Sequence, residues 1–272
     1  MSSARNDSIS KTIIVALALC IVCSVVVSAA AVLLKPTQVR NSTLNMKENI
    51  LRAANLVQGP VSGPEIEEKF KQVTARIVDL ETGNYVEPSE VGAASVEAFD
   101  QFKAAKDPAY SVGLNGAEDI AGIKRAERYA KVYLLEQEGR VERVIVPVRG
   151  YGLWSTLYGF LALEGDANTV VGLTFYQHAE TPGLGGEVDN PAWKAQWPGK
   201  KIYDLEQGAE PQIELVKGGV RADSANAVYG VDALAGATLT SRGITNLLHF
   251  WLGQQGFQQY LEKVRSGEAN NV

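Results

Sequence analysis

A long apolar run dominates the hydrophobic pattern near the start of the chain, from Thr12 to Leu34. The run contains no charged residue, and its only polar residues are Thr12, Ser24 and Ser28. A helix rising ~1.5 Å per residue would extend roughly 34 Å over this run, enough to cross a hydrocarbon core of about 30 Å. We therefore predict one transmembrane helix over residues 12–34, preceded by a cytoplasmic N-terminus over residues 1–11. A cleaved signal peptide is the alternative, although its apolar stretch is usually only about 7 to 15 residues long.

Helical spacing of apolar residues resumes from Ser42 to Val57 and indicates a stalk helix that leads out of the membrane. A second helix is predicted from Ile66 to Val78, grading into a strand near residues 76–80. Residues 87–116 are rich in Pro, Ser, Gly and Ala without a clean period, which is typical of a long surface connection. Residues 35–120 are therefore assigned to the stalk helix and the N-terminal part of the soluble region.

The pattern changes to that of strands from Tyr129 onward. Runs of β-branched and aromatic residues are separated by short turns, and these runs are Tyr129–Leu135, Val141–Val148, Ser155–Leu163 and Thr169–Tyr176. Such spacing predicts an antiparallel meander.

Further elements follow the predicted meander. Asn190 and Pro191 suit the N-cap and the first position of a short helix over residues 192–197. A strand is predicted over residues 212–217. Two apolar-striped helices follow, separated at Gly253; they cover residues 244–252 and 257–264. No internal repeat is visible, so residues 121–272 are predicted to form one α+β domain with an antiparallel sheet and flanking helices.

Composition adds a constraint on partners. The 272 residues are 46% hydrophobic and 21% charged, with a formal net charge of -5. Residues 1–40 hold four basic residues and one acidic residue of the 26 and 31 in the chain, so the region beyond them is strongly acidic. An acidic domain repels phosphate backbones, which argues against nucleic acid as a partner.

Both cysteines of the chain, Cys20 and Cys23, lie inside the apolar run. The predicted globular region therefore has no thiol nucleophile, no structural disulfide and no cysteine-based zinc site. The simplest interpretation of the pair is that both are small apolar packing residues of the membrane helix.

Charges on either side of the apolar run give little information on orientation. Arg5 and Lys11 precede it, whereas Lys35, Arg40 and Lys47 follow it. Taken alone, the positive-inside rule leans weakly towards a cytoplasmic position for the domain.

Two glycine-bearing stretches are the candidate sites, residues 180–187 (ETPGLGGE) and residues 232–243 (DALAGATLTSRG). Neither has the spacing of a Walker A loop or of a dinucleotide fingerprint. Backbone lacking a Cβ can approach a ligand closely. In the second stretch, hydroxyls at Thr238, Thr240 and Ser241 precede a predicted helix, whose N-terminus favours a phosphate. The alternative is that Thr240 or Ser241 serves only as an N-cap.

Conventional catalytic groups are scarce. His249 falls among apolar residues of a predicted helix and is interpreted as a core or boundary residue, whereas His178 adjoins the first glycine stretch and is the better site candidate. We predict no catalytic residue and no metal site. A bound organic cofactor is the expected source of reactivity.

The stretch Gly236-Ala237-Thr238, preceded by Asp232, resembles the flavinylation motif of the FMN-binding domain family. In that family FMN is joined through its phosphate to the threonine hydroxyl by a separate flavin transferase. The family motif has Ser or Thr where this chain has Ala235. The acceptor Thr238 is present, so the resemblance still implies attachment of FMN, although attachment could be slower.

Other stretches resemble the C subunit of sodium-translocating NADH:quinone oxidoreductases, a family related to the G subunit of the Rnf complex. They are residues 78–84 (VDLETGN), 150–155 (GYGLWS), 216–219 (VKGG) and 250–253 (FWLG). The resemblance implies a membrane-anchored subunit with covalent FMN that relays electrons one at a time from NADH towards ubiquinone in a sodium pump. The implied partners are the other subunits, the flavin transferase and the lipid bilayer. The FMN-binding domain, residues 121–272, would lie on the periplasmic side of the inner membrane.

We also predict the contacts that the cofactor makes around this motif. Thr238 is the FMN acceptor, within the motif that includes Gly236 and Ala237. The loop residues Thr181, Gly183, Leu184 and Gly185 are expected against the ring, Lys217, Gly218 and Thr240 near the phosphate or ribityl chain, and Trp154 as a wall of the site. Three alternatives stay open: the Rnf flavin subunit, an anchored scaffold without flavin, and a released extracytoplasmic binding protein.

Overall fold

The computed structural model describes residues 9–271, so most of the predicted N-terminal segment 1–11 lies outside the described residues. The chain divides into two units, one up to Asn45 and one from Met46 onward. Helix α1 runs from Ile9 to Ala53 without interruption and includes Pro36. The helices predicted over residues 12–34 and from Ser42 are thus parts of one helix.

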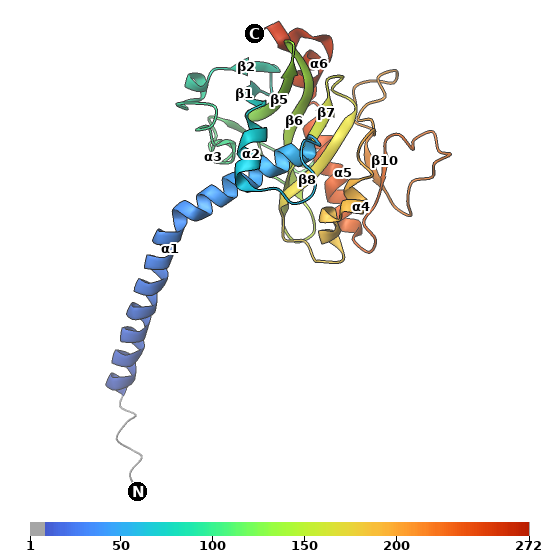
Figure 1. Cartoon of the computed structure of the whole chain (residues 1–272). Coiled ribbons are helices and arrows are strands. Elements are labelled where there is room, and N and C mark those ends of the chain that lie inside the picture. The colour runs from blue at the N-terminus through green and yellow to red at the C-terminus, as the bar shows by residue number, and fades with distance from the viewer. Residues whose placement is uncertain (1–8, 272) are drawn as a thin grey trace. The chain divides into compact units, whose positions relative to one another are not determined.

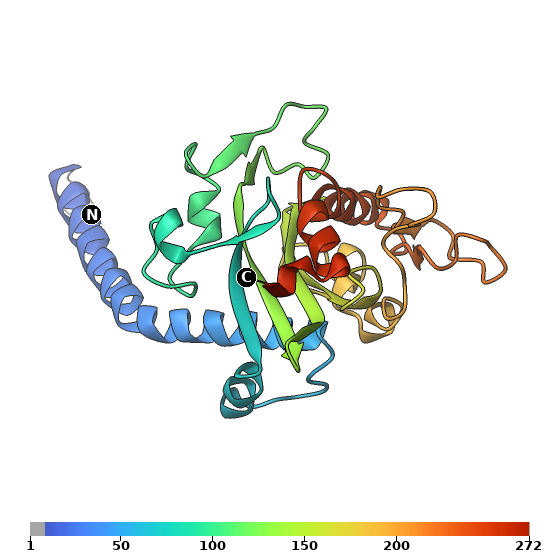
Figure 2. The same cartoon turned by 90° about the horizontal axis from the view of Figure 1, so that it is seen from above.

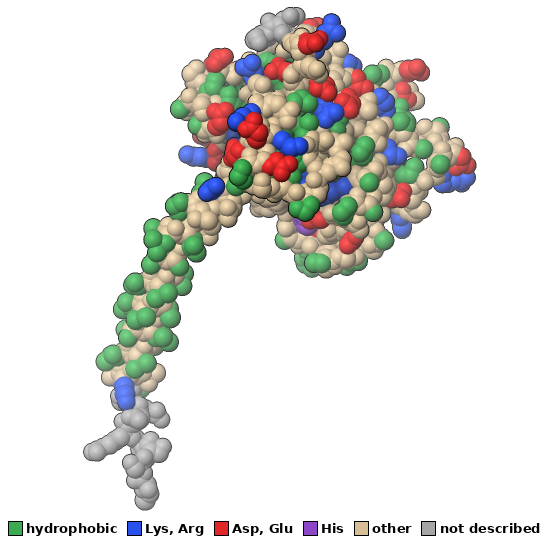
Figure 3. All heavy atoms as spheres, in the orientation of Figure 1, with side chains coloured by type: hydrophobic (Ala, Val, Ile, Leu, Met, Phe, Trp, Pro, Cys, Tyr) green, Lys and Arg blue, Asp and Glu red, His purple; other side chains and the backbone are tan. Residues whose placement is uncertain are grey.

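Within α1, the apolar run is long enough to cross a membrane, and its side chains are exposed to solvent. Apolar side chains cover this part of the helix on the face drawn in Figure 3. Exposed apolar surface of this extent is unfavourable in water, because each buried Å² of apolar surface is worth about 25 cal/mol. The observation agrees with the predicted membrane helix.

A six-stranded antiparallel sheet forms the centre of the second unit, with the order β2-β1-β5-β6-β7-β8 (Figure 1). Its strands are β1 (Val73–Asp79), β2 (Asn84–Val86), β5 (Tyr129–Gln137), β6 (Arg140–Tyr151), β7 (Thr156–Glu164) and β8 (Val170–Gln177). The predicted meander over β5 to β8 is confirmed. Because β1 pairs with β5, the sheet joins residues from both predicted ranges, 35–120 and 121–272.

Helices cover both faces of this sheet (Figure 2). On one face, α5 (Thr238–Leu252) and α6 (Gln258–Ser266) pack on alternate strand residues such as Val132 and Val146. On the other face lie the end of α1 and the short helix α2 (Gly63–Phe70). There the Ala54 carbonyl accepts a hydrogen bond from Arg143, and Phe70 contacts Tyr133 edge-on. Strand residues buried on two faces explain the nearly continuous apolar runs of the sequence.

Helix α5 approaches the sheet very closely at two glycines. A Cβ built on Gly150 would lie 2.5 Å from the Cβ of Leu247, and one built on Gly243 would lie 2.4 Å from the Tyr151 carbonyl oxygen. Larger residues would separate helix and sheet. These contacts fix the N-terminal end of α5 beside the connection between β6 and β7. The predicted separation of the last two helices at Gly253 is confirmed, since this glycine is the C-cap of α5.

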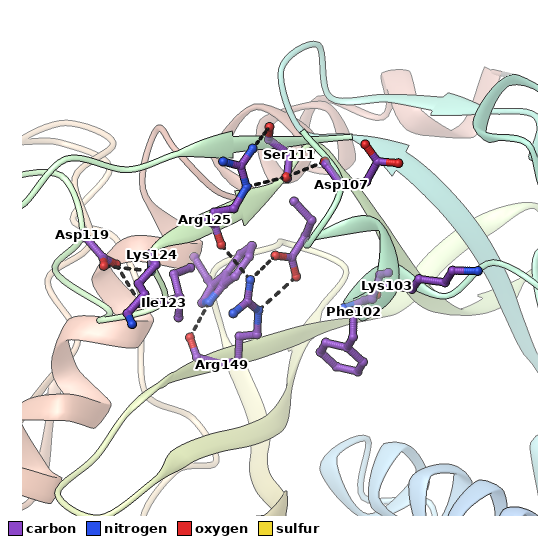
Figure 4. Close-up of polar contacts among 12 residues, drawn as sticks. Phe102, Lys103, Asp107, Ser111, Asp119, Ile123, Lys124, Arg125 and Arg149 are labelled. Atoms are coloured by element: carbon purple, nitrogen blue, oxygen red, sulfur yellow. Dashed lines mark hydrogen bonds and ion pairs between the residues drawn. The ribbon is translucent and has the colours of Figure 1, made fainter. Parts of the chain in front are cut away.

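The predicted long connection over residues 87–116 contains only short elements. They are η1 (Pro88–Val91), α3 (Gln101–Ala104) and β3 (Ser111–Gly113), which pairs with β4 (Arg125–Glu127). Figure 4 shows how side chains fasten this region, with Arg125 bonded to Ser111 and the Asp119 carboxylate accepting backbone N–H groups of Ile123 and Lys124.

A buried ion pair joins β4 to the central sheet. Arg149 of β6 donates to the Glu127 carboxylate at 2.5 Å and to the Arg125 carbonyl at 2.9 Å (Figure 4). The Glu127 side chain is 1% exposed. The Arg149 carbonyl in turn accepts the indole N–H of Trp251 on α5. The network ties three distant segments of the chain together.

The remaining elements are η2 (Gly185–Asp189), α4 (Pro191–Lys194), η3 (Glu268–Asn271), and the parallel pair β9 (Glu214–Val216) and β10 (Gly230–Asp232). Asn190 caps α4 as predicted, with its side chain accepting the Ala192 N–H. The helix ends three residues earlier than the predicted 192–197, because the chain turns at Ala195.

Candidate functional site

The N-terminus of α5 carries unpaired hydrogen-bond donors. Thr238 is its first residue, and Ala237 occupies the N-cap position without a side-chain cap. The Ser241 N–H already bonds to the Ala237 carbonyl. Within the described part of the chain, the three preceding backbone N–H groups, of residues 238–240, have no acceptor. Such a helix end attracts an anion, because its free N–H groups and the helix dipole both favour negative charge.

The alternative that Thr240 or Ser241 is the N-cap is wrong. Both residues lie inside the first turn of α5 and are buried. The Ser241 hydroxyl donates to the Ala237 carbonyl and accepts the Leu234 N–H, while the Thr240 hydroxyl donates to Glu180. Thr238 is therefore the exposed hydroxyl at this helix end.

A groove of about 700 Å³ lies beside Thr238. Its lining includes Gly236, Lys217 and Gly218 from the predicted set, together with Arg242 from α5. Lys217 and Arg242 are both exposed, and neither side chain has an ion-pair or hydrogen-bond partner among the residues described. The lining also includes the carboxylates of Glu214 and Asp232, so Lys217 and Arg242 are local cationic groups beside the free helix N-terminus rather than a net positive charge of the groove.

The two glycine-bearing stretches meet at this site. The first forms a tight turn, in which the Thr181 carbonyl accepts the N–H groups of Leu184 and Gly186. A Cβ built on Gly236 would lie 3.0 Å from Leu184 Cδ2, so the loop tip contacts the motif before α5. Gly236 has a φ of 73°, in the left-handed region that favours glycine.

Glu180 holds the base of the first stretch and was assigned no role from the sequence. It is 5% exposed, and its carboxylate accepts hydrogen bonds from the Thr240 hydroxyl at 2.6 Å and from the N–H groups of Leu153 and Trp154 at 3.0 Å. Burial alone would raise the pKa of Glu180, but these bonds hold its pKa below the ordinary value. The carboxylate is therefore ionised at neutral pH.

Large apolar side chains are exposed around these polar groups. Trp154 is 64% exposed, Leu239 52% and Leu184 44%. The predicted wall Trp154 and loop residue Leu184 thus belong to segments that Glu180 connects to α5. Exposed aromatic and aliphatic side chains beside an anion site suit a ligand with a phosphate and a flat apolar ring.

The two histidines occupy different settings. His249 bonds through Nε2 to the Ile213 carbonyl at 2.8 Å, which confirms its interpretation as a satisfied boundary residue. His178 bonds to Asp189 at 2.9 Å, and its Nδ1 accepts the Glu180 backbone N–H. His178 therefore supports the Glu180 loop.

Comparisons with known proteins agree with this geometry. The family described as the FMN-binding domain matches residues 152–253. The C subunit of the Na(+)-translocating NADH-quinone reductase of Pseudomonas aeruginosa is 53% identical over 98% of this chain and 100% of its own length. The protein of the same name from Pasteurella multocida is 44% identical over 98% of both chains. The crystal structure of NqrC from Shewanella oneidensis superposes with a TM-score of 0.71 at 35% identity, covering 84% of this chain and 98% of the other.

Proposed function

This chain belongs to the NqrC family, the C subunits of the Na(+)-translocating NADH-quinone reductase, and on that premise we propose that Thr238 carries FMN through a phosphoester bond. As a member of the family, the chain is an FMN-binding flavoprotein subunit of that oxidoreductase. Its partners include the other subunits of the complex.

The observation that carries the attachment proposal is the setting of the Thr238 hydroxyl. It is exposed at a helix end with free N–H groups, and it faces the groove that Lys217 and Arg242 also line. A phosphoryl group on this oxygen would lie close to the free backbone N–H groups and to the cationic side chains of Lys217 and Arg242. The groove is large, and Gly236 in its lining contacts Leu184 of the glycine loop, so the residues present fit the phosphate end of a flavin nucleotide.

Attachment forms a bond between Thr238 Oγ and the flavin phosphorus. An activated flavin nucleotide supplies the phosphorus, and its phosphoanhydride bond breaks as the new bond forms. The Thr238 proton passes to solvent water, and the second nucleotide leaves as a nucleoside monophosphate that carries the negative charge of the broken bond. A flavin transferase would catalyse this step, and Ala235 at the edge of the motif removes a hydroxyl that this enzyme could otherwise contact.

Bound FMN supplies the capacity to accept and release electrons one at a time between NADH and ubiquinone. This chain's contribution is to hold the cofactor at one place in the complex, because a covalent tether keeps its effective concentration high whatever its oxidation state. Thr181, Gly183, Leu184, Gly185 and Trp154 would lie along the ring. Gly218 and Thr240, with Lys217, would lie near the phosphate or ribityl chain.

The membrane position completes the proposal. Residues 12–34 of α1 would cross the inner membrane once, in contact with lipid, and the FMN-binding domain at residues 121–272 would lie on the periplasmic side. The apolar character and full exposure of this part of α1 support the crossing.

Mass spectrometry tests the acceptor directly. The protein is co-expressed with a flavin transferase, and the peptide that contains Thr238 is expected to gain the mass of one phosphoester-linked FMN. The variant Thr238→Val should lose covalent flavin and remain folded by circular dichroism. Thr82→Val is the matched control, since it removes an exposed threonine hydroxyl outside the groove and should keep the modification.

Two results would contradict the proposal. Covalent flavin on Thr238→Val would show that another residue is the acceptor. A wild-type protein without flavin absorbance after co-expression would favour an anchored scaffold.

A further inference from the structure

Three separate segments converge on the side chain of Glu180. Its Oε1 atom accepts the N–H groups of Leu153 and Trp154, in the connection between β6 and β7. Its Oε2 atom accepts the hydroxyl of Thr240, in the first turn of α5. Glu180 itself begins the glycine loop. The three segments that carry the exposed apolar residues of the site are therefore bonded to one carboxylate.

The surroundings of this carboxylate accommodate no larger neighbours. A Cβ built on Gly152 would lie 2.6 Å from Glu180 Oε1, and one built on Gly185 would lie 2.6 Å from Oε2. One glycine therefore makes room for each of the two carboxylate oxygens. The space around Glu180 therefore fits a carboxylate at this position. Among the side-chain bonds described, the carboxylate has no cationic partner.

The buried carboxylate is held in its charged form by hydrogen bonds from Thr240, Leu153 and Trp154, without an ion pair among the bonds described. Thr240 lies two residues after Thr238 on the same helical turn, so the carboxylate is bonded directly to the turn that would carry FMN. A negative charge near a group that gains an electron makes that gain less favourable. The charge of Glu180 therefore affects how readily FMN on Thr238 gains an electron, and its hydrogen bonds hold the helix turn that would carry FMN.

We infer that Glu180 is the positioning residue of the flavin site: its carboxylate holds the first turn of α5, the Leu153–Trp154 segment and the glycine loop in one arrangement, and its charge lowers the reduction potential of FMN on Thr238. This inference rests on the proposed function. It acts through neighbouring groups and requires no contact between Glu180 and the flavin.

Two variants separate the charge from the reach of the side chain. Glu180→Gln keeps the length and one acceptor oxygen but removes the charge. Glu180→Asp keeps the charge but is one methylene shorter, so it cannot maintain the bonds to Thr240 and to Trp154 together. Glu206→Gln is the control for net charge, because Glu206 is exposed and its side chain has no hydrogen-bond or ion-pair partner among the described residues.

The charge is tested by spectroelectrochemical titration of the full-length flavinylated protein in detergent. Glu180→Gln is expected to shift the midpoint potential of FMN in the positive direction, whereas Glu206→Gln keeps the wild-type value. An unchanged potential in Glu180→Gln overturns the electrostatic part of the inference, because a purely structural role leaves the potential where it was.

The positioning is tested by the visible circular dichroism of FMN and by hydrogen exchange of the peptide covering residues 152–155. Glu180→Asp is expected to change the flavin band and to accelerate exchange. If Glu180→Asp does not fold, Thr240→Val replaces it in both measurements. This variant removes the hydrogen bond between Thr240 and Glu180 and keeps the charge of Glu180. If the folded variant keeps the flavin band and the hydrogen-exchange rate of the wild-type protein, the positioning role of Glu180 is overturned. Absence of FMN from wild-type Thr238 instead overturns the proposed function, and the inference falls with it.

Discussion

Arg242 and Lys217 are the cationic side chains of the groove beside Thr238, and Arg242 lies on the same helix as this proposed acceptor. We predict that Arg242→Ala slows flavin attachment by about tenfold, since a hydrogen bond to a charged group contributes about 1.5–3 kcal/mol. The time course of flavin transfer to the purified protein measures this rate. Arg221→Ala is the control, because Arg221 is exposed and pairs with Asp223. Equal rates for Arg242→Ala and wild type would remove Arg242 from the phosphate site.

Glu180 also predicts a pH dependence of stability. Because its pKa is lowered in the folded state, its stabilisation is present above the unfolded pKa of about 4.5 and is lost as the pH falls through the folded pKa. Glu180→Gln should therefore flatten the decrease in melting temperature below about pH 4.5. His178 is the titratable side chain bonded to the same loop, and it faces Asp189. Glu206→Gln is the control, because Glu206 is exposed and its side chain has no hydrogen-bond or ion-pair partner among the described residues, so this variant should keep the wild-type pH dependence. A decrease in melting temperature as steep in Glu180→Gln as in wild type would contradict the prediction.

At the residue scale, the sequence predicts those site residues that stand together in short motifs. The proposed acceptor Thr238 and the glycines around it stand in contiguous stretches of the sequence. The role of Glu180 was missed because its partners lie 26, 27 and 60 residues away along the chain. A carboxylate next to a glycine-rich loop was the available signal, yet the sequence does not show which distant hydroxyl and N–H groups it meets.

Among the elements, the ion pair between β4 and β6 offers the sharpest test of stability. We predict that Glu127→Ala lowers the free energy of unfolding by about 3–5 kcal/mol, because removing one partner leaves the Arg149 charge buried and uncompensated. Chemical denaturation of the detergent-solubilised protein measures the change. The matched control is Glu81→Ala. The Glu81 side chain is 70% exposed in its contact with Arg128, and its loss should cost at most about 1 kcal/mol. Equal effects of the two variants would contradict a special role for the buried pair.

The strands β5 to β8 were predictable because each carries a β-branched or aromatic run between clear turn signals. The short elements of residues 87–116 were not, since β3 and β4 are held by contacts such as Arg125 with Ser111, which no local period records. The start of α5 was placed at Ile244, six residues late, because its first turn is polar. Thr240 and Ser241 are buried there through hydrogen bonds to Glu180, Ala237 and Leu234.

For the whole molecule, the side of the membrane on which the domain lies is the property that the flanking charges and the family bear on. Arg5 and Lys11 precede the apolar run, while Lys35, Arg40 and Lys47 follow it. A difference of one basic residue is a weak determinant of orientation. Family resemblance favours the periplasmic side, so the two lines of reasoning disagree and a direct measurement decides between them.

The confinement of both native cysteines to the apolar run makes that measurement simple. In a background with Cys20→Ala and Cys23→Ala, the variant Ala225→Cys places a single thiol at an exposed position of the domain. A membrane-impermeant maleimide applied to intact spheroplasts is expected to label this thiol without lysis. Ser3→Cys, in the N-terminal segment predicted to be cytoplasmic, should react only after lysis. The opposite pattern would place the domain and its flavin in the cytoplasm, where a transferase acting outside the membrane could not reach Thr238.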